Sequence, residues 1–275
     1  MKRAIYFLSL IIFTAATSFA ADEKVGFRLQ RGYLIVVQCS IGDLTGLTGI
    51  VDTGVTETVV DMSIVKRLGL ATRVDRATFL TRELKVVAVS IPPIALGTKI
   101  TGPVAGIATD LHSLTFQFGI RPDVLIGMDV LTQANLLIDF KNRELSFISS
   151  AIPPMAHLIP LAGASRIPLI EVRFHGKSLR LQLDTGAEGV LLYASAVGQP
   201  VWEAREVRVA GGAGALIAKS ADSGNIHLAD TLIFNPLVLV VEERAPADFD
   251  GLLGANVLRA QRVGLDFAHH ILTWQ

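Results

Sequence analysis

Two stretches of the chain share one pattern, IVDTGVTETVVDMSIV at residues 50–65 and QLDTGAEGVLLYASAV at residues 182–197. Each places Asp-Thr-Gly at the end of an apolar strand and follows it with a second apolar stretch. The two aspartates, Asp52 and Asp184, are 132 residues apart. One Asp-Thr-Gly is a weak signal, but a pair in matched surroundings indicates an internal repeat.

Two further pairs of segments follow in the same order. DVLIGMDVL at residues 123–131 matches DGLLGANVL at 250–258, and LIDFKNRELSF at 137–147 matches GLDFAHHILTW at 264–274. Three matched signals at similar spacing predict two related halves. We place the halves at residues 21–150 and 151–275, with the proline-containing stretch 149–160 (SSAIPPMAHLIP) as the linker between them.

Short apolar runs separated by Gly, Pro, Asp or Asn dominate the rest of the chain, and they predict strands. Many short strands with few helices are typical of an all-β barrel or sandwich and not of a βαβ fold. The expected strands are Tyr33–Cys39, Val86–Ile91, Leu145–Ile148, Leu169–Phe174, Leu179–Leu183, Val207–Ala210 and Leu237–Val241. The expected short helices are Met62–Leu68, Val130–Ala134 and Asn256–Arg259.

Composition narrows the range of functions. The 275 residues carry 25 Lys plus Arg and 25 Asp plus Glu, so a nucleic-acid binder with a basic excess is not favoured. One cysteine excludes an intramolecular disulfide framework and a Cys-rich zinc site, and the six histidines form no HExxH motif. Cys39 lies in an apolar run, which favours a buried strand residue over a reactive thiol.

The N-terminus reads as an export signal. Lys2 and Arg3 form a basic region, Ile5 to Phe13 is apolar, and Ser18-Phe19-Ala20 supplies small residues at a cleavage site. We expect residues 1–20 to be removed and the protein to be secreted or periplasmic. A retained membrane anchor is the alternative, although the apolar run is shorter than the roughly 20 residues of a span. Cleavage would leave 23 basic and 25 acidic residues, a net charge of about −2.

A twofold arrangement of the halves would bring Asp52 and Asp184 face to face. Two carboxylates at hydrogen-bonding distance hold one proton between them, because both cannot ionise cheaply. One carboxylate then acts as a base toward a water, and the carboxylic acid polarises the substrate carbonyl. Glycine permits close approach of the opposing turn, and threonine hydroxyls can bond across to it. The supporting residues are Thr53, Gly54, Thr185 and Gly186.

On these motifs, the sequence over residues 28–275 resembles the aspartic proteases, with a pepsin-like single chain made of two retropepsin-like halves. The resemblance implies a bilobal, pseudo-twofold pair of β-barrel domains and hydrolysis of peptide bonds by a water between Asp52 and Asp184. It likewise implies no metal, no cofactor and no covalent intermediate. It also implies a hydrophobic-hydrophobic-Gly segment beside each catalytic turn. These segments are Leu125-Ile126-Gly127 and Leu252-Leu253-Gly254.

The sequence departs from the family pattern after each Asp-Thr-Gly. Val55 and Ala187 stand where pepsin-like enzymes usually have Ser or Thr, whose hydroxyl bonds the outer carboxylate oxygen. Retropepsins often have Ala there, so Val55 is the less usual of the two. We expect weaker hydrogen-bond support for the aspartates and a less acidic pH optimum, with no peak of activity near pH 2–3.

The resemblance also implies a flap hairpin in each half. The second half has a glycine-rich tip with Gly211, Gly212 and Gly214, whereas the first half has the glycine-free RVDRATFLTREL at residues 73–84. Phe79 is the candidate for closing over substrate from the first flap, and a buried structural role is an equal alternative. Glu57 and Glu188 lie close to the aspartates, but ordinary surface or turn roles are favoured.

The leading interpretation is an exported aspartic endopeptidase that acts as a monomer on a peptide or protein substrate. A catalytically weak or inactive peptide-binding protein with the same fold is the first alternative, which Val55 and the first flap keep open. Two independent domains that each pair with another chain are the second alternative. No nucleic-acid partner and no membrane span after signal cleavage are expected.

Overall fold

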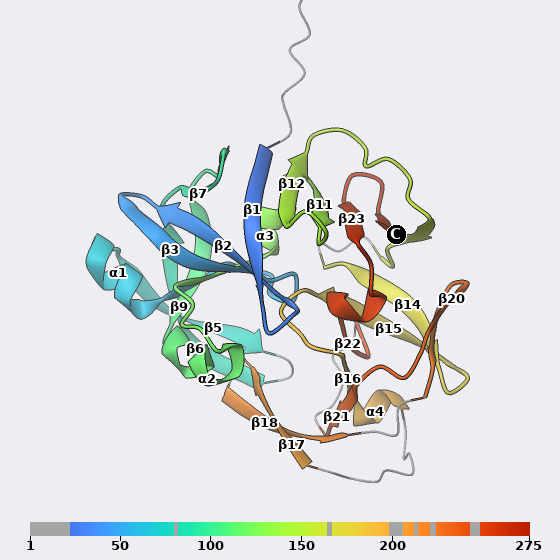
Figure 1. Ribbon diagram of the computed structural model, residues 1–275. Coiled ribbons are helices and arrows are strands. Elements are labelled where there is room, and N and C mark those ends of the chain that lie inside the picture. The colour runs from blue at the N-terminus through green and yellow to red at the C-terminus, as the bar shows by residue number, and fades with distance from the viewer. Residues whose placement is uncertain are drawn as a thin grey trace, which may run out of the picture.

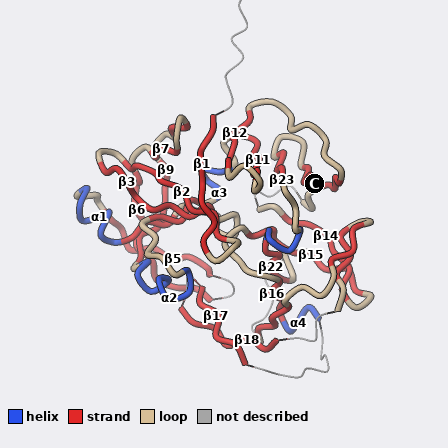
Figure 2. Tube along the Cα trace, in the orientation of Figure 1, coloured by secondary structure: helices blue, strands red, loops and turns tan. Residues whose placement is uncertain are grey.

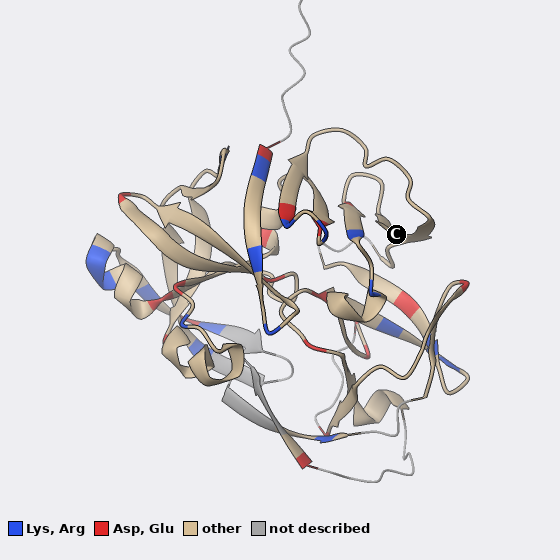
Figure 3. Cartoon of the chain, in the orientation of Figure 1, with Lys and Arg blue, Asp and Glu red and all other residues tan. Residues whose placement is uncertain are grey.

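The computed structural model describes residues 23–79, 82–163, 167–197, 206–211, 214–220, 224–242 and 248–275. The predicted signal peptide, residues 1–20, lies outside these ranges. Within them, no helix is long and apolar enough to cross a bilayer. Basic and acidic residues occur singly or in small groups over the view of Figure 3.

Strands make up most of the described chain, and the helices are short pieces between them (Figure 2). The predicted all-β class is therefore confirmed. The first half contains β1 Glu23–Gln30, β2 Leu34–Ile41, β3 Leu44–Val51, β4 Val59–Asp61, α1 Met62–Leu68, β5 Thr72–Phe79, β6 Arg82–Ile91, β7 Ile94–Leu96, β8 Lys99–Ile100, β9 Val104–Thr109, η1 Leu111–Leu114, α2 Thr115–Phe118, β10 Val124–Ile126, α3 Met128–Leu131, β11 Asn135–Asp139 and β12 Glu144–Ile148. The second half contains β13 His157–Pro160, β14 Leu169–Phe174, β15 Lys177–Asp184, β16 Val190–Tyr193, α4 Ala194–Val197, β17 Glu206–Gly211, β18 Gly214–Ser220, β19 Ile226–Leu228, β20 Thr231–Ile233, β21 Val238–Val241, β22 Gly251–Gly254, η2 Ala255–Leu258, β23 Arg262–Asp266 and β24 Ile271–Trp274.

Seven strands of each half are paired in the same order. In the first half the order is β2-β3-β10-β4-β9-β6-β5, and in the second it is β14-β15-β22-β16-β21-β18-β17. The directions also match, because β3–β10, β4–β9, β15–β22 and β16–β21 are the parallel pairs of these two series and the other pairs are antiparallel. The internal repeat read from the sequence is thus a repeat of strand topology.

The third matched pair of segments joins the halves. Strand β11 pairs antiparallel with β23, and β12 and β24 extend this sheet on either side, with β1 and β13 beyond them. Figure 1 shows β11, β12 and β23 side by side at the top of the molecule. Register pairs Leu137 with Gly264, which are equivalent positions of the repeat because they are 127 residues apart, as are Asp139 and Asp266.

The expected linker needs one correction. The last four residues of the stretch 149–160 form β13, which pairs with β24 through His157 and Trp274. Their rings also stack with centroids 5.0 Å apart. The linker therefore ends as an edge strand of the joining sheet, where Pro160 is tolerated because an edge strand has one unpaired side.

One hydrophobic cluster runs through both halves. It contains Val25 and Ile35 from the first half and Leu183, Val263 and Trp274 from the second, all of them buried. A continuous core of this kind is what makes two halves fold as one unit. The polar residue Asn135 is buried at the same junction, where its Oδ1 accepts from the backbone N–H groups of Phe267 at 2.8 Å and Ala268 at 3.3 Å.

Most predicted elements lie where the sequence placed them. Helix α1 matches its predicted bounds because Asp61 caps its first turn, accepting from Ser63 N at 2.9 Å, and Gly69 ends it with φ of 60°. The second helix was predicted two residues late, since α3 begins directly after Gly127. The η1 and α2 turns were not predicted, and their pattern was too short to show helical periodicity.

Candidate active site

Each Asp-Thr-Gly turn begins at the end of a strand held from both sides. Strand β3 ends at Val51, and β15 ends at Asp184. Asp52 N donates to Ile126 O at 3.0 Å, which ties the first turn to β10. Asp184 lies opposite Gly254 in the parallel pairing of β15 with β22. The second hydrophobic stretch of each repeat forms β4 or β16, which pairs with β10 or β22, so the strand beside each turn is itself held on its other side.

The two threonines link the turns through four reciprocal hydrogen bonds. Thr53 Oγ1 donates to Leu183 O, and Thr185 Oγ1 donates to Val51 O, both at 2.7 Å. Each hydroxyl also accepts from the opposite backbone, Thr185 N to Thr53 Oγ1 and Thr53 N to Thr185 Oγ1, both at 3.0 Å. Both side chains are buried, so water does not compete for these bonds.

The two glycines let the carboxyl groups approach. A Cβ atom placed on Gly54 would lie 2.5 Å from Cγ of Asp184, and one placed on Gly186 would lie 2.8 Å from Cγ of Asp52. A side chain at either position would displace the opposite carboxyl group, so glycine leaves the room that this arrangement of the two carboxyls needs. The sequence predicted this close approach from the motif alone.

Asp52 and Asp184 form a buried pair of carboxyl groups, called the aspartate pair from here on. Each residue is 7% exposed. Each group is close enough to the other to act as its hydrogen-bond partner when one of them is protonated. Burial raises the pKa of Asp52 above its ordinary value, and burial together with the neighbouring charge of Asp52 raises the pKa of Asp184 well above it. The pair therefore retains a proton at a pH where isolated aspartates have lost theirs.

Backbone N–H groups of the turns donate hydrogen bonds to both carboxyl groups. Gly54 N donates to Asp52 Oδ1 at 2.8 Å, and Gly186 N donates to Asp184 Oδ1 at 2.7 Å. The backbone of Ala187 donates a further hydrogen bond to Asp184. These bonds lower each carboxyl pKa and partly offset the effect of burial. Val55, at the equivalent of Ala187, packs against an apolar cluster that includes Tyr33 and supplies no hydroxyl.

The two hydrophobic-Gly segments lie beside the turns. Ile126 pairs with Val51 in the parallel register of β10 and β3, and Leu125 precedes it in the same strand. Gly127 is packed against the backbone after the first turn, since a Cβ there would be 2.7 Å from the carbonyl carbon of Glu57. In the second half Leu252, Leu253 and Gly254 form β22 beside β15, and a Cβ on Gly254 would be 2.6 Å from Ala187 O.

Two acidic residues lie close to the Asp-Thr-Gly turns in the sequence. Glu57 and Glu188 are both exposed. Burial, with the nearby charges of Glu188 and Asp184, raises the pKa of the Tyr33 phenol, although Arg31 opposes this shift. Tyr33 from the first half thus lies within electrostatic range of the second turn. The sequence did not predict this, because nothing in one sequence pairs residues from different halves.

Both candidate flaps are two-stranded hairpins. Strands β5 and β6 pair up to Phe79 and Arg82, and β17 and β18 pair up to Gly211 and Gly214. The tip residue Gly212 lies outside the described residues, and so does any account of where the Phe79 side chain points. The glycine-free first sequence therefore forms the same kind of hairpin as the glycine-rich second one.

One residue of the site was missed at the sequence level. Gln182 is 3% exposed on β15, and its Nε2 donates to Thr53 O in the opposite turn at 2.9 Å. The equivalent residue of the first half is the buried Ile50. Alignment of the two repeats places the amide of Gln182 opposite the aliphatic Ile50, and this difference is the sequence signal for Gln182.

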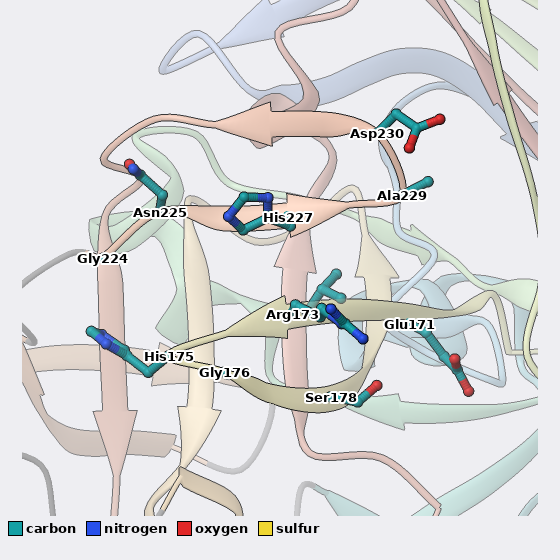
Figure 4. Close-up of a pocket in the computed structure, with 11 residues that line it drawn as sticks. Glu171, Arg173, His175, Gly176, Ser178, Gly224, Asn225, His227, Ala229 and Asp230 are labelled. Carbon is teal, nitrogen blue, oxygen red and sulfur yellow. The ribbon is translucent and has the colours of Figure 1, made fainter.

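A cavity of about 800 Å³ lies away from the aspartate pair. Figure 4 shows it on β14, β15 and β19, where Arg173 faces His227 on the neighbouring strand. Most of the side chains that line it are exposed, and they include acidic, basic and neutral groups, so they do not suggest one kind of ligand. Within the described ranges, no three His, Cys, Asp or Glu side chains meet as a possible metal site. Cys39 is buried, and burial raises its thiol pKa to about 12, so it stays protonated at neutral pH.

The aspartate pair has the features of general acid–base chemistry. It combines two buried neighbouring carboxyl groups, pKa values raised above their ordinary values, and backbone hydrogen bonds to each carboxyl group. Residues 37–130, about a third of the chain, match the family model described as aspartyl protease. The matched range contains Asp52 and the Leu125–Gly127 segment and supports an aspartic protease family. No curated protein matches the chain.

Proposed function

We propose that this protein is an exported aspartic endopeptidase that hydrolyses peptide bonds with a water held between Asp52 and Asp184. The observation that carries the proposal is the set of four reciprocal hydrogen bonds between Thr53 and Thr185, which holds the two turns together. The family match in the first half supports the same chemistry. No part of the proposal requires a metal or a cofactor.

The proposal includes a bilobal, pseudo-twofold arrangement with halves at residues 21–150 and 151–275. Three relations between equivalent positions support it. Thr53 and Thr185 bond to each other's turns, Leu137 pairs with Gly264, and the two series of seven strands have one order. Equivalent residues meet each other only where a twofold axis passes between them. The axis proposed here runs between the turns and through the β11–β23 pairing.

In the proposed mechanism the pair holds one proton at the start. The ionised carboxylate takes a proton from the water as the water oxygen bonds to the substrate carbonyl carbon, and the protonated partner donates to the carbonyl oxygen. The resulting tetrahedral diol collapses as the pair takes a proton from one of its hydroxyls, the C=O bond re-forms, the C–N bond breaks, and the leaving nitrogen receives a proton from the pair. The water ends as part of the new carboxyl group, and the pair returns to its starting proton count.

Export and monomeric action complete the proposal. The basic and apolar pattern of residues 1–20 supports a secreted or periplasmic location. One chain supplies both aspartates, and one core joins its halves, which supports activity as a monomer. Sedimentation with activity measured on dilution tests this point, because an obligate dimer that loses activity when diluted would contradict it.

The test of the chemistry is cleavage of a fluorogenic peptide library by three purified proteins: wild type, Asp52→Asn and Asp43→Asn. Asp43 is exposed in the β2–β3 turn, so its variant is the matched control for the same exchange. We expect Asp52→Asn to lose cleavage by roughly a thousandfold or more while it keeps the wild-type circular dichroism spectrum. Asp43→Asn should cleave like wild type.

The same measurement separates the enzyme from a peptide-binding protein. If wild type fails to cleave any peptide yet binds some of them, and Asp52→Asn binds them equally, the fold serves recognition and the proposed hydrolysis is wrong. If wild type and Asp52→Asn cleave at the same rate, a contaminating protease or another site is responsible, which also contradicts the proposal.

A further inference from the structure

The environment of the aspartate pair is not symmetric, and the difference begins at Gln182. This side chain comes from the second half, two residues before Asp184, and it is almost fully buried. The first half has Ile50 at the equivalent place, also buried. Burying an amide costs free energy unless its polar atoms are paired, so an amide in an otherwise apolar strand position needs a partner.

The partner of this amide is in the opposite turn. Gln182 Nε2 lies 2.9 Å from Thr53 O. A backbone carbonyl oxygen only accepts hydrogen bonds, so the amide nitrogen and not its oxygen must face it. The bond therefore crosses between the halves next to the threonine hydrogen bonds, but it has no counterpart that Ile50 can make toward Thr185.

The accepted bond reaches Asp52 through a single peptide group. The carbonyl of Thr53 and the N–H of Gly54 belong to the same peptide unit, and that N–H donates to Asp52 Oδ1 at 2.8 Å. A donor on the carbonyl polarises the peptide and strengthens its N–H as a donor, by roughly 10–30% per bond. Gln182 therefore stands at the start of a hydrogen-bond chain that ends on the carboxylate of Asp52.

This hydrogen-bond chain acts on the aspartate that accepts fewer hydrogen bonds from backbone N–H groups. Asp184 accepts from the N–H groups of Gly186 and Ala187, and Asp52 accepts from that of Gly54. We propose that Gln182 is a positioning residue that holds the Thr53–Gly54 peptide and stabilises the ionised form of Asp52, so that the two aspartates are not equivalent before substrate binds. This role depends on the proposed function only in the test that measures catalysis.

Removing the amide should disfavour the ionised form of Asp52. Among the residues that the structure describes, few other titratable groups lie near the pair. Asp184 lies opposite, and Tyr33 lies near Asp184 together with Glu188 and Arg31. None of these side chains is altered by a change at residue 182, so a shift in titration can be assigned to the lost amide. The expected shift is upward, since a carboxylate that loses hydrogen-bond support binds its proton more tightly.

The test compares Gln182→Met with Ile50→Met. Both variants place the same unbranched apolar side chain two residues before an aspartate, but only the first removes a donor. In Gln182→Met, we expect the acid limb of the kcat/KM profile to move to higher pH by roughly half a unit, about threefold in the proton-dissociation constant. In Ile50→Met, the acid limb should stay where wild type has it, even if the variant is less stable.

A second readout needs no catalysis. In protein labelled with ¹³C at the aspartyl carboxyl carbons, the Asp52 signal is assigned by its loss in Asp52→Asn and followed against pH. We expect its titration to move up in Gln182→Met and not in Ile50→Met. An unshifted Asp52 titration in folded Gln182→Met would overturn the role of Gln182. Absence of cleavage by wild type, together with a shifted titration, would refute the endopeptidase and leave the role of Gln182 standing.

Discussion

At the residue scale, the site depends on side chains that act across the junction of the halves. The hydroxyls of Thr53 and Thr185 each make two hydrogen bonds to the opposite turn. Gly54 and Gly186 leave room for the opposite carboxyl group. The motif Asp-Thr-Gly is thus explained position by position: the acid does the proposed chemistry, the hydroxyl fixes the partner turn, and the missing side chain lets the two acids meet.

Replacing either threonine with valine tests this account of the motif. Valine keeps the β-branched shape, so the change removes the hydroxyl and leaves a backbone N–H and a carbonyl unpaired in a buried place. We expect Thr53→Val and Thr185→Val each to lower the free energy of unfolding by about 1–3 kcal/mol, measured by urea denaturation. Thr45→Val, at an exposed position of β3, should change it by less than about 0.5 kcal/mol. Equal effects at all three positions would contradict the role of the hydroxyls.

Val55 gives a second prediction at this scale. A hydroxyl at this position bonds the outer carboxylate oxygen in the pepsin-like enzymes that the sequence resembles. Val55→Thr should therefore stabilise the ionised form of Asp52, lower its pKa, and move the acid limb of kcat/KM to lower pH by roughly half a unit. The control is Val74→Thr, the same exchange at a side chain that is 72% exposed. An acid limb that stays in place would show that Val55 does not weaken the support of Asp52.

At the element scale, the halves are joined by strands and not by a free linker. The pairing of β11 with β23 and of β13 with β24 makes one sheet from segments more than a hundred residues apart. Asn135 closes this junction by accepting two backbone N–H groups of the second half and donating to Ser150 O at 2.9 Å. The junction should therefore contribute to the stability of both halves together.

Asn135→Leu tests this contribution. Leucine fills a similar volume but leaves two N–H groups and one carbonyl without their partner, so we expect a loss of about 2–4 kcal/mol in the free energy of unfolding. Asn225→Leu, at an exposed position, is the matched control. Urea unfolding followed by tryptophan fluorescence and by circular dichroism should still give one shared transition. Full stability of Asn135→Leu would contradict the proposed importance of the junction.

The elements also show what the sequence could predict. Matched segments predicted the repeat, the hydrophobic-Gly strands and helix α1, because each carries its own local pattern. The interactions between the halves could not be predicted from the sequence, because they join residues that are distant in the chain. They are the β11–β23 register, the position of Tyr33 near the second turn, and the hydrogen bond from Gln182. The sequence did not predict that residues 157–160 form a strand, because they do so only by pairing with β24, which is distant in the chain.

At the scale of the whole molecule, burial of the aspartate pair has a cost that depends on pH. The pKa values of both carboxyls are raised in the folded protein, so the folded pair binds more protons than the same two aspartates in the unfolded chain above about pH 4. The contribution of the pair to stability should therefore be greatest at low pH and be lost as pH rises through its folded pKa values. Asp184→Asn removes one of the two like charges.

We expect Asp184→Asn to be more stable than wild type at pH 7, by roughly 1–3 kcal/mol, and similar to it near pH 3. Thermal unfolding at a series of pH values measures the difference. Asp43→Asn should follow the wild-type curve throughout. A gain in Asp184→Asn that is the same at pH 3 and pH 7 would mean that the pair does not share a proton in the folded protein.

The central claim is that Asp52 and Asp184 share one proton in one site. The most direct measurement is the pH titration of ¹³C-labelled aspartyl carboxyls in wild type and in Asp184→Asn. The account predicts two coupled steps in wild type, the upper one well above the ordinary aspartate range, and a single step for Asp52 once residue 184 is Asn. If Asp52 titrates identically in both proteins, the two carboxyls do not interact, and the proposed site is wrong.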